Sequence, residues 1–107
     1  MYQVKNMVLA RMSTWSFKEG KREEGFSDLD ANIGVAARGI RGFRGYMMLL
    51  SRDNPNTAIV IGLWADEESL KASEEKVMEG AKQRMTELVA DPPKTEYYRV
   101  FSFETKQ

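Results

Sequence analysis

The sequence predicts an α+β fold of the ferredoxin-like type, with the order β-α-β-β-α-β and a four-stranded antiparallel sheet. Three observations predict it: a β-hairpin in the middle of the chain, a strand-like segment towards each end, and an apolar helical stripe on either side of the hairpin. Both helices can cover the same face of one sheet, as in a two-layer sandwich. The 107 residues suffice for a single domain, 1–107, with its own core.

The first element is a strand predicted over Val4–Ser13, where apolar residues alternate loosely along the chain. We expect this strand to be central in the sheet. Arg11 lies within it among apolar neighbours. Because a half-buried arginine needs a partner, we expect a carboxylate or a bound anion beside it.

The first helix has a clear pattern from Phe26 onwards, because apolar residues recur every three or four positions and form one stripe. The stripe consists of Phe26, Leu29, Ile33, Ala36 or Ala37, and Ile40. The segment Ser16–Glu19 fits a capping box at the start of this helix, although the glycines that follow weaken the first turns. Gly39 or Gly42 is expected to end it.

The central hairpin consists of two apolar runs, Phe43–Leu50 and Ala58–Trp64, on either side of the turn residues Asp53–Asn56. Neither run alternates apolar with polar residues. The expected faces are Phe43, Met47 and Leu49 against Tyr46, Met48 and Leu50, and Ile59, Ile61 and Leu63 against Ala58, Val60 and Trp64. A hairpin with one face in water would carry polar residues at every second position. A ligand, a partner subunit or both must therefore cover the second face.

The second helix is predicted to begin at Asp66, a favourable N-cap that is followed by two glutamates. Its apolar stripe comprises Leu70, Val77, Ala81, Met85 and Leu88, and it fits one continuous helix or a short helix followed by a longer one. The prolines of Asp91–Pro93 are expected to stop it. The last strand is predicted over Thr95–Phe103, with Tyr97, Phe101 and Phe103 on one face and Tyr98 and Val100 on the other.

Composition restricts the chemistry that this chain can perform. Sixteen basic and sixteen acidic residues balance, which argues against binding to nucleic acid or to an anionic membrane surface. The chain has no cysteine and no histidine, so it lacks thiolate nucleophiles and the commonest ligands of zinc and haem iron. We expect no metal and no cofactor. The N-terminus lacks a signal-peptide core and no apolar run could span a bilayer, so we expect a soluble, cytoplasmic protein.

Four short features are spread along the chain: Gly20 before the first helix, Gly42-Phe43-Arg44-Gly45, Asp53-Asn54-Pro55, and Leu63-Trp64-Ala65-Asp66-Glu67-Glu68-Ser69-Leu70. Together with the order of the elements, they resemble the antibiotic biosynthesis monooxygenase family over nearly the whole chain. The resemblance implies a homodimer, a dimeric α/β barrel in which two sheets face each other over apolar pockets. The family includes cofactor-independent oxygenases that act on polycyclic aromatic substrates, haem-degrading enzymes, and many proteins of unknown role.

Two departures from the family pattern argue against haem degradation. Haem-degrading members use a histidine early in the second helix as the iron ligand, where this chain has Ser73 and Glu74. They also carry an asparagine just before an arginine on the first strand, where Ala10 precedes Arg11.

The candidate pocket residues are aromatic or polar side chains near the expected sheet. Trp64 could stack on a flat ligand or pack in the core, and Trp15 could lie at a pocket rim, at an interface or in the core. The side chains that could converge on an anionic or phenolic substrate are Arg11, Tyr46, Arg84 and Tyr97, with Asn6 as a further hydrogen-bonding candidate.

The resulting hypothesis is a monooxygenase-like homodimer that takes a small apolar or aromatic ligand. In a cofactor-independent oxidation, the anion of a phenolic substrate would reduce dioxygen directly, with Arg11 or Arg84 stabilising that anion and Trp64 positioning the ring. No residue stands out as the base. The alternative is a non-catalytic ligand-binding or interaction domain of the same fold.

Overall fold

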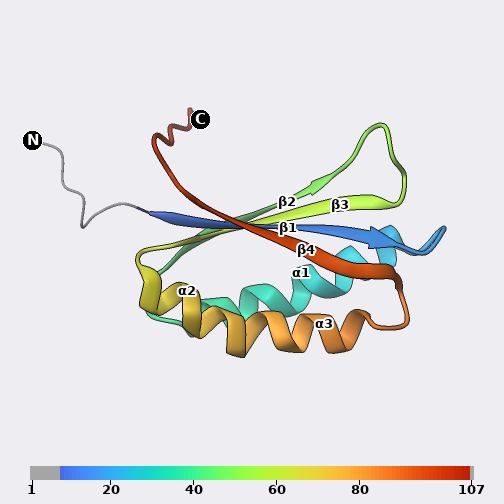
Figure 1. Cartoon of the computed structure of the whole chain (residues 1–107), viewed down its shortest axis with the longest axis horizontal. Helices are drawn as coiled ribbons and strands as arrows, with labels where there is room; N and C mark the ends of the chain where they lie inside the picture. The colour runs from blue at the N-terminus through green and yellow to red at the C-terminus, as the bar shows by residue number, and fades with distance from the viewer. Residues whose placement is uncertain (1–7, 107) are drawn as a thin grey trace, which may run out of the picture.

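The computed structural model describes residues 8–106 and contains a four-stranded antiparallel sheet with its helices on one face (Figure 1). The elements are β1 Leu9–Phe17, α1 Arg22–Arg38, β2 Phe43–Leu50, β3 Thr57–Trp64, α2 Glu67–Ser73, η2 Glu74–Met78, α3 Glu79–Met85 and β4 Val89–Arg99. The predicted β-α-β-β-α-β order and the ferredoxin-like class are confirmed.

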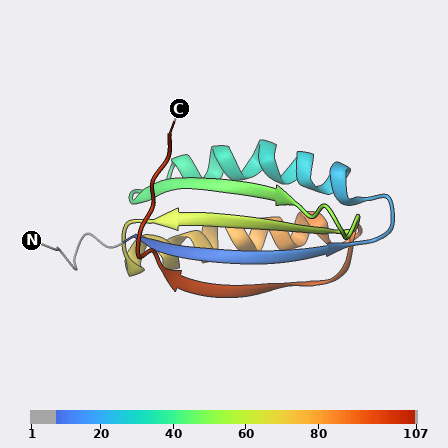
Figure 2. The same cartoon turned by 90° about the horizontal axis from the view of Figure 1, so that it is seen from above.

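The strand order in the sheet is β2-β3-β1-β4, so β1 is central as expected, and β2 and β4 form the edges (Figure 2). The predicted strand Val4–Ser13 begins outside the described residues and ends too early. The strand continues to Phe17, because Trp15 and Phe17 lie on the same face as Ser13 and are buried in the core. The predicted capping box is therefore wrong: Ser16 pairs with Thr57 in the sheet, and α1 begins only at Arg22.

The predicted hairpin is present, but a bulge at its start changes one face. Phe43 is opposite Trp64 while Gly45 is opposite Leu63, so Arg44 is an extra residue in β2. Gly45 adopts φ +148°, a conformation that favours glycine. As a result Phe43 lies on the helix side with Tyr46, and not with Met47 as predicted.

The helical segment after the hairpin is continuous from α2 through η2 to α3, with a π-helical turn in the middle. Asp66 caps it as predicted, accepting a hydrogen bond from the Ser69 backbone N–H at 2.8 Å. The helix ends at Met85, earlier than predicted, and β4 then runs from Val89 through both prolines. An edge strand tolerates proline because one side of its backbone has no neighbouring strand. Phe101 and Phe103, predicted to be in this strand, lie beyond its end at Arg99.

The two faces of the sheet differ in their cover. The core lies between the sheet and the helices, and its largest side chains include Trp15, Phe17, Leu29, Trp64 and Met85. The opposite face, here called the open face, has no helix over it (Figure 1) and carries Met12, Met47, Leu49, Ile59, Ile61, Leu63 and Tyr98. Met47, Leu49 and Tyr98 are exposed in the single chain. Within residues 8–106, no helix is long and apolar enough to cross a membrane.

Candidate functional site

Arg11 occupies the centre of the candidate site. It extends from β1 towards the helices, and only 5% of its surface is exposed. Its Nη1 donates to the hydroxyl of Ser73 and to Glu74 Oε1, the latter at 3.3 Å, and its guanidinium lies 5.7 Å from the centre of the Trp64 ring. Burial lowers the pKa of Arg11, and the carboxylate of Glu74 opposes this shift. Of the two expected partners for Arg11, a carboxylate or a bound anion, the structure shows a carboxylate, that of Glu74.

Glu74 connects this buried arginine to the surface. The hydroxyl of Tyr97, on the neighbouring strand β4, donates to the same Oε1 atom at 2.5 Å. Arg11 and Tyr97 are cross-strand partners, so the sheet register places both side chains beside the helix. Glu74 is the first residue of the π-helical turn, a local irregularity that is frequent at functional sites. The result is a chain of three polar groups, Arg11–Glu74–Tyr97.

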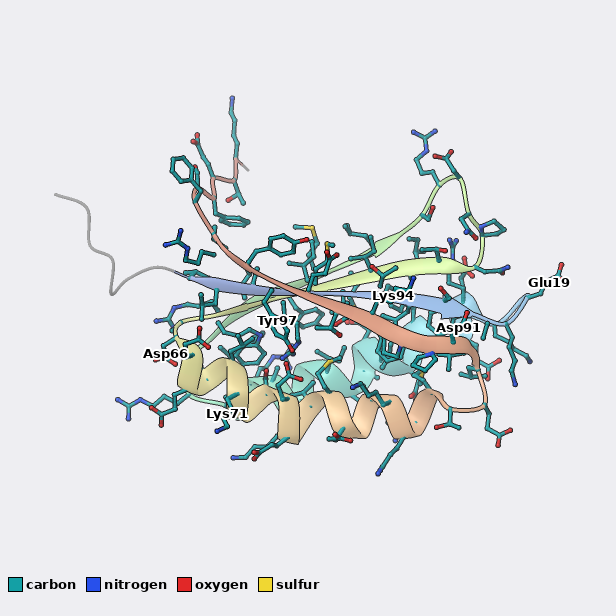
Figure 3. The ribbon with its side chains drawn as sticks, viewed as in Figure 1. Glu19, Asp66, Lys71, Asp91, Lys94 and Tyr97 are labelled. Atoms are coloured by element: carbon teal, nitrogen blue, oxygen red, sulfur yellow. The ribbon has the colours of Figure 1, made fainter. Side chains whose placement is uncertain are left out.

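An open groove of about 870 Å³ lies between α2 and β4, and Glu74 and Tyr97 form part of its wall. Its walls include Leu9, Leu70, Lys71, Glu74, Tyr97 and Tyr98. Figure 3 shows Tyr97 on β4 and Lys71 on the facing helix. Most of the groove surface is apolar, and its volume falls in the usual range for small-molecule sites. A flat ligand could therefore reach the carboxylate of Glu74 from solvent.

A second cavity lies inside the core and is far smaller, about 20 Å³. It is lined by Arg11, Ser13, Tyr46, Gly62 and Trp64, among others, and has room for about one water molecule. Trp64 is 2% exposed, and its ring packs against Phe43 with centroids 5.4 Å apart. A Cβ at position 62 would approach Trp64 Nε1 to 2.9 Å, so the indole requires a glycine there. Trp64 therefore packs in the core in this structure and does not line the groove.

The remaining candidate residues have other interaction partners. Trp15 is buried and stacks on Phe17, and the Tyr46 hydroxyl donates to Asp30 on α1 at 2.7 Å. Arg84 forms two hydrogen bonds to Asp28, at 2.9 and 2.6 Å, in a separate groove between α1 and α3. Asn6 lies outside the described residues. Of the predicted set, the structure brings Tyr97 next to Arg11 through Glu74, and it places Trp64 and Tyr46 with Arg11 in the lining of the inner cavity.

Ser73 and Glu74 were not among the predicted site residues. The sequence indicated that Arg11 needs an anionic partner, and it marked positions 73 and 74 as those of the histidine in haem-degrading relatives. These two signals could have been combined. Sixteen carboxylates were available, however, and only the placement of α2 and η2 against β1 selects Glu74.

The pairing of Tyr97 with Glu74 predicts a late tyrosine ionisation. The hydrogen bond to Glu74 raises the pKa of Tyr97 above its ordinary value of 10.0, with burial as a smaller cause. Because the folded-state pKa is raised, the stabilising contribution is complete below pH 10 and is lost as the pH rises through the folded-state value. An absorbance titration at alkaline pH measures tyrosine ionisation, and the part of the signal that disappears in Tyr97→Phe belongs to Tyr97. In Glu74→Gln, the pKa of Tyr97 should be lower than in the wild-type protein. An unchanged titration in Glu74→Gln would contradict the pairing.

Comparisons with known proteins agree with this architecture. Residues 8–91 match the family model described as "Antibiotic biosynthesis monooxygenase". No curated protein matches the sequence. Similar solved structures include a protein of unknown function from Nitrosomonas europaea (20% identity, TM-score 0.78, 96% of this chain and 98% of that chain covered). A proposed antibiotic biosynthesis monooxygenase from the same organism has 19% identity and a TM-score of 0.77, with 94% and 96% covered. At these identities the structural matches show the fold alone.

Proposed function

Because the chain belongs to the antibiotic biosynthesis monooxygenase family, we propose that it binds a flat phenolic or quinol substrate in the groove between α2 and β4 and oxidises it without a cofactor. The observation that carries the proposal is the position of Glu74, a carboxylate in the groove wall that is held by Arg11 and Tyr97. Apolar groove walls suit the rings of such a substrate, and a convergent polar cluster suits its hydroxyl group.

The proposed reaction starts with proton transfer from the substrate to Glu74. The substrate anion then passes one electron to dioxygen, and the resulting carbon radical and superoxide form a C–O bond. Glu74 returns its proton to the peroxide anion that forms. The resulting hydroperoxide loses water as its O–O bond breaks, and the C–H proton leaves with that water. One oxygen atom ends in a ketone and the other in water, so no external reductant is required. Arg11 acts as a positioning residue in this scheme, because it touches Glu74 from inside the core.

Ligand binding tests the groove itself. Polycyclic phenols and quinones should bind to the wild-type protein, and Tyr97→Ala should weaken that binding by about tenfold, because one aromatic wall is lost. Arg84→Ala is the matched control, since Arg84 lies in the separate groove between α1 and α3. Isothermal titration calorimetry measures both affinities. If Arg84→Ala weakened ligand binding and Tyr97→Ala did not, the ligand would bind outside the groove between α2 and β4.

Oxygen uptake tests the role of Glu74. Glu74→Gln keeps the shape and a hydrogen-bond acceptor but cannot take the proton, so we expect uptake to fall by about 100-fold or more while affinity changes little. An oxygen electrode with the reduced members of the same ligand panel gives the rate. Unaltered uptake in Glu74→Gln would rule out Glu74 as the base.

A non-catalytic ligand-binding domain is the second candidate. It is favoured by the saturation of Glu74 Oε1, which already accepts hydrogen bonds from Arg11 and Tyr97. This candidate predicts binding in the groove with no oxygen uptake. For either candidate we propose a homodimer, in which the open face of one copy covers that of another.

A further inference from the structure

The proposed oxidation needs a positive charge beside the substrate oxygen, because a carboxylate is a weak base. Carboxylic acids in general have pKa values about six units below those of phenols, so proton transfer from a phenol to a carboxylate is unfavourable by about a millionfold in water. A cation about 4–6 Å from an acid lowers the pKa of that acid by about one to three units. A cation in the groove that reaches the substrate would therefore favour the anion.

The two arginines that the sequence suggested for this task are both engaged elsewhere. Arg11 is 5% exposed, and its guanidinium donates to Ser73 and Glu74 from inside the core. Arg84 forms two hydrogen bonds to Asp28, in the separate groove between α1 and α3. Neither arginine lines the groove between α2 and β4. A substrate bound there needs a different cation.

Lys71 is the cation in the groove wall that lies next to Glu74. The Glu74 backbone N–H bonds to the carbonyls of Leu70 and Lys71, so Lys71 is one helical turn before Glu74, and residues three apart lie on the same side of a helix. Both side chains line the groove, and Figure 3 shows Lys71 on the helix that faces Tyr97. Within residues 8–106, the exposed Lys71 forms no ion pair. Arg99, the other cation of the groove, lies two residues beyond Tyr97 at the end of β4 and has an interaction of its own.

From this arrangement we infer that Lys71 stabilises the phenolate that forms when Glu74 accepts the substrate proton. The inference rests on the proposed function and assigns its anion-stabilising residue. The ammonium group of Lys71 donates a hydrogen bond to the substrate oxygen once that oxygen is charged. The rest of the groove wall does not favour an anion, because three carboxylates, those of Glu67, Glu68 and Glu74, outnumber the two cations. The substrate should therefore enter as the neutral phenol and ionise beside Lys71.

The ionisation of a bound phenol tests this role directly. The probe is a nitronaphthol, whose hydroxyl group ionises near neutral pH and whose anion absorbs visible light. The tyrosines of the groove do not ionise in this range, because the hydrogen bond to Glu74 raises the pKa of Tyr97 and removal from water raises that of Tyr98, both above 10.0. In Lys71→Gln the pKa of the bound probe should be about one unit higher than in the wild-type protein. Lys71→Arg keeps the charge and should retain most of the wild-type value.

Lys76→Gln is the matched control for the loss of one positive charge. Lys76 is also an exposed lysine of this helical segment, but it lines two other clefts, so the pKa of the bound probe should not change. Oxygen uptake gives a second measurement. In Lys71→Gln, kcat should fall by about tenfold with little change in KM, because the ammonium group acts on the anion and not on the neutral phenol.

The outcomes separate the role of Lys71 from the proposed function. A probe that binds with the same pKa in the wild type and in Lys71→Gln overturns the inference and leaves the proposed function intact. Equal pKa shifts in Lys71→Gln and Lys76→Gln would reflect a general effect of surface charge, which also overturns the inference. A wild-type protein that binds no naphthol overturns both. A pKa that depends on Lys71, without any oxygen uptake, supports the role of Lys71 and favours the non-catalytic candidate for the groove.

Discussion

Replacing Trp64 with alanine should lower the free energy of unfolding by about 3–5 kcal/mol, because it removes a fully buried indole from a packed core. The indole contacts Phe43 and lies beneath the Arg11 guanidinium, so its loss also opens space beside a buried charge. Trp64→Phe should cost about 1–2 kcal/mol, since the phenyl ring fills part of the same volume. Urea denaturation gives the free energy of unfolding of the wild type and of both Trp64 variants. Val35→Ala is the control at an exposed position, and it should change the free energy of unfolding by less than about 0.5 kcal/mol.

Ligand binding to the same variants separates a core tryptophan from a pocket wall. The groove is lined by other residues, so Trp64→Phe should bind the phenol panel with nearly the affinity of the wild type. If Trp64 formed a pocket wall, Trp64→Ala would lose binding while losing little stability. Such a result would mean that the inner cavity opens well beyond about 20 Å³ when a ligand binds.

Replacing Glu74 with alanine should destabilise the protein by about 2 kcal/mol, whereas replacing Arg11 with methionine should cost less than about 1 kcal/mol. The asymmetry follows from burial. Without Glu74 the guanidinium of Arg11, 5% exposed, keeps its charge and loses its carboxylate, whereas Glu74 alone is 34% exposed and can be hydrated in the groove. Breaking a fully buried pair typically costs about 3–5 kcal/mol, and the partial exposure of Glu74 reduces that figure.

The double variant Arg11→Met/Glu74→Ala provides the control for this asymmetry. It should be more stable than Glu74→Ala alone, because the unpaired charge is gone and the methionine can pack against Trp64. Denaturation of the four proteins completes a double-mutant cycle. Equal losses from the two single variants would show that Arg11 is hydrated in the folded protein, against its position in the core.

Features of the sequence that act over a few residues gave reliable predictions of local structure. The turn at Asp53–Asn56 lies between two runs rich in β-branched and aromatic residues, and both strands of the hairpin appear where they were predicted. Asp66 caps α2 because its side chain reaches a backbone N–H three residues away, a contact that needs no distant partner. The apolar stripes also identified the buried faces of both helices, including Leu29, Val77 and Met85.

Predictions that depended on neighbouring strands were less successful. The bulge at Gly45 moves Phe43 to the helix side, and a bulge is defined only by its register with β3. Prolines 92 and 93 were expected to end the helix, yet they lie within β4, because that strand has a neighbour on one side only. The extension of β1 to Phe17 likewise depends on pairing with both β3 and β4.

The sequence by itself determined the order of the elements, the hairpin, the cap at Asp66 and the need of Arg11 for an anionic partner. These follow from residue types and spacing, because turns, caps and amphipathic stripes are set by interactions within about ten residues. Only the tertiary structure decided that this partner is Glu74, that Tyr97 shares it, and that Trp64 fills the core instead of lining the groove. Those contacts join residues as far apart as Arg11 and Tyr97, and their geometry arises only when the helix packs against the paired strands.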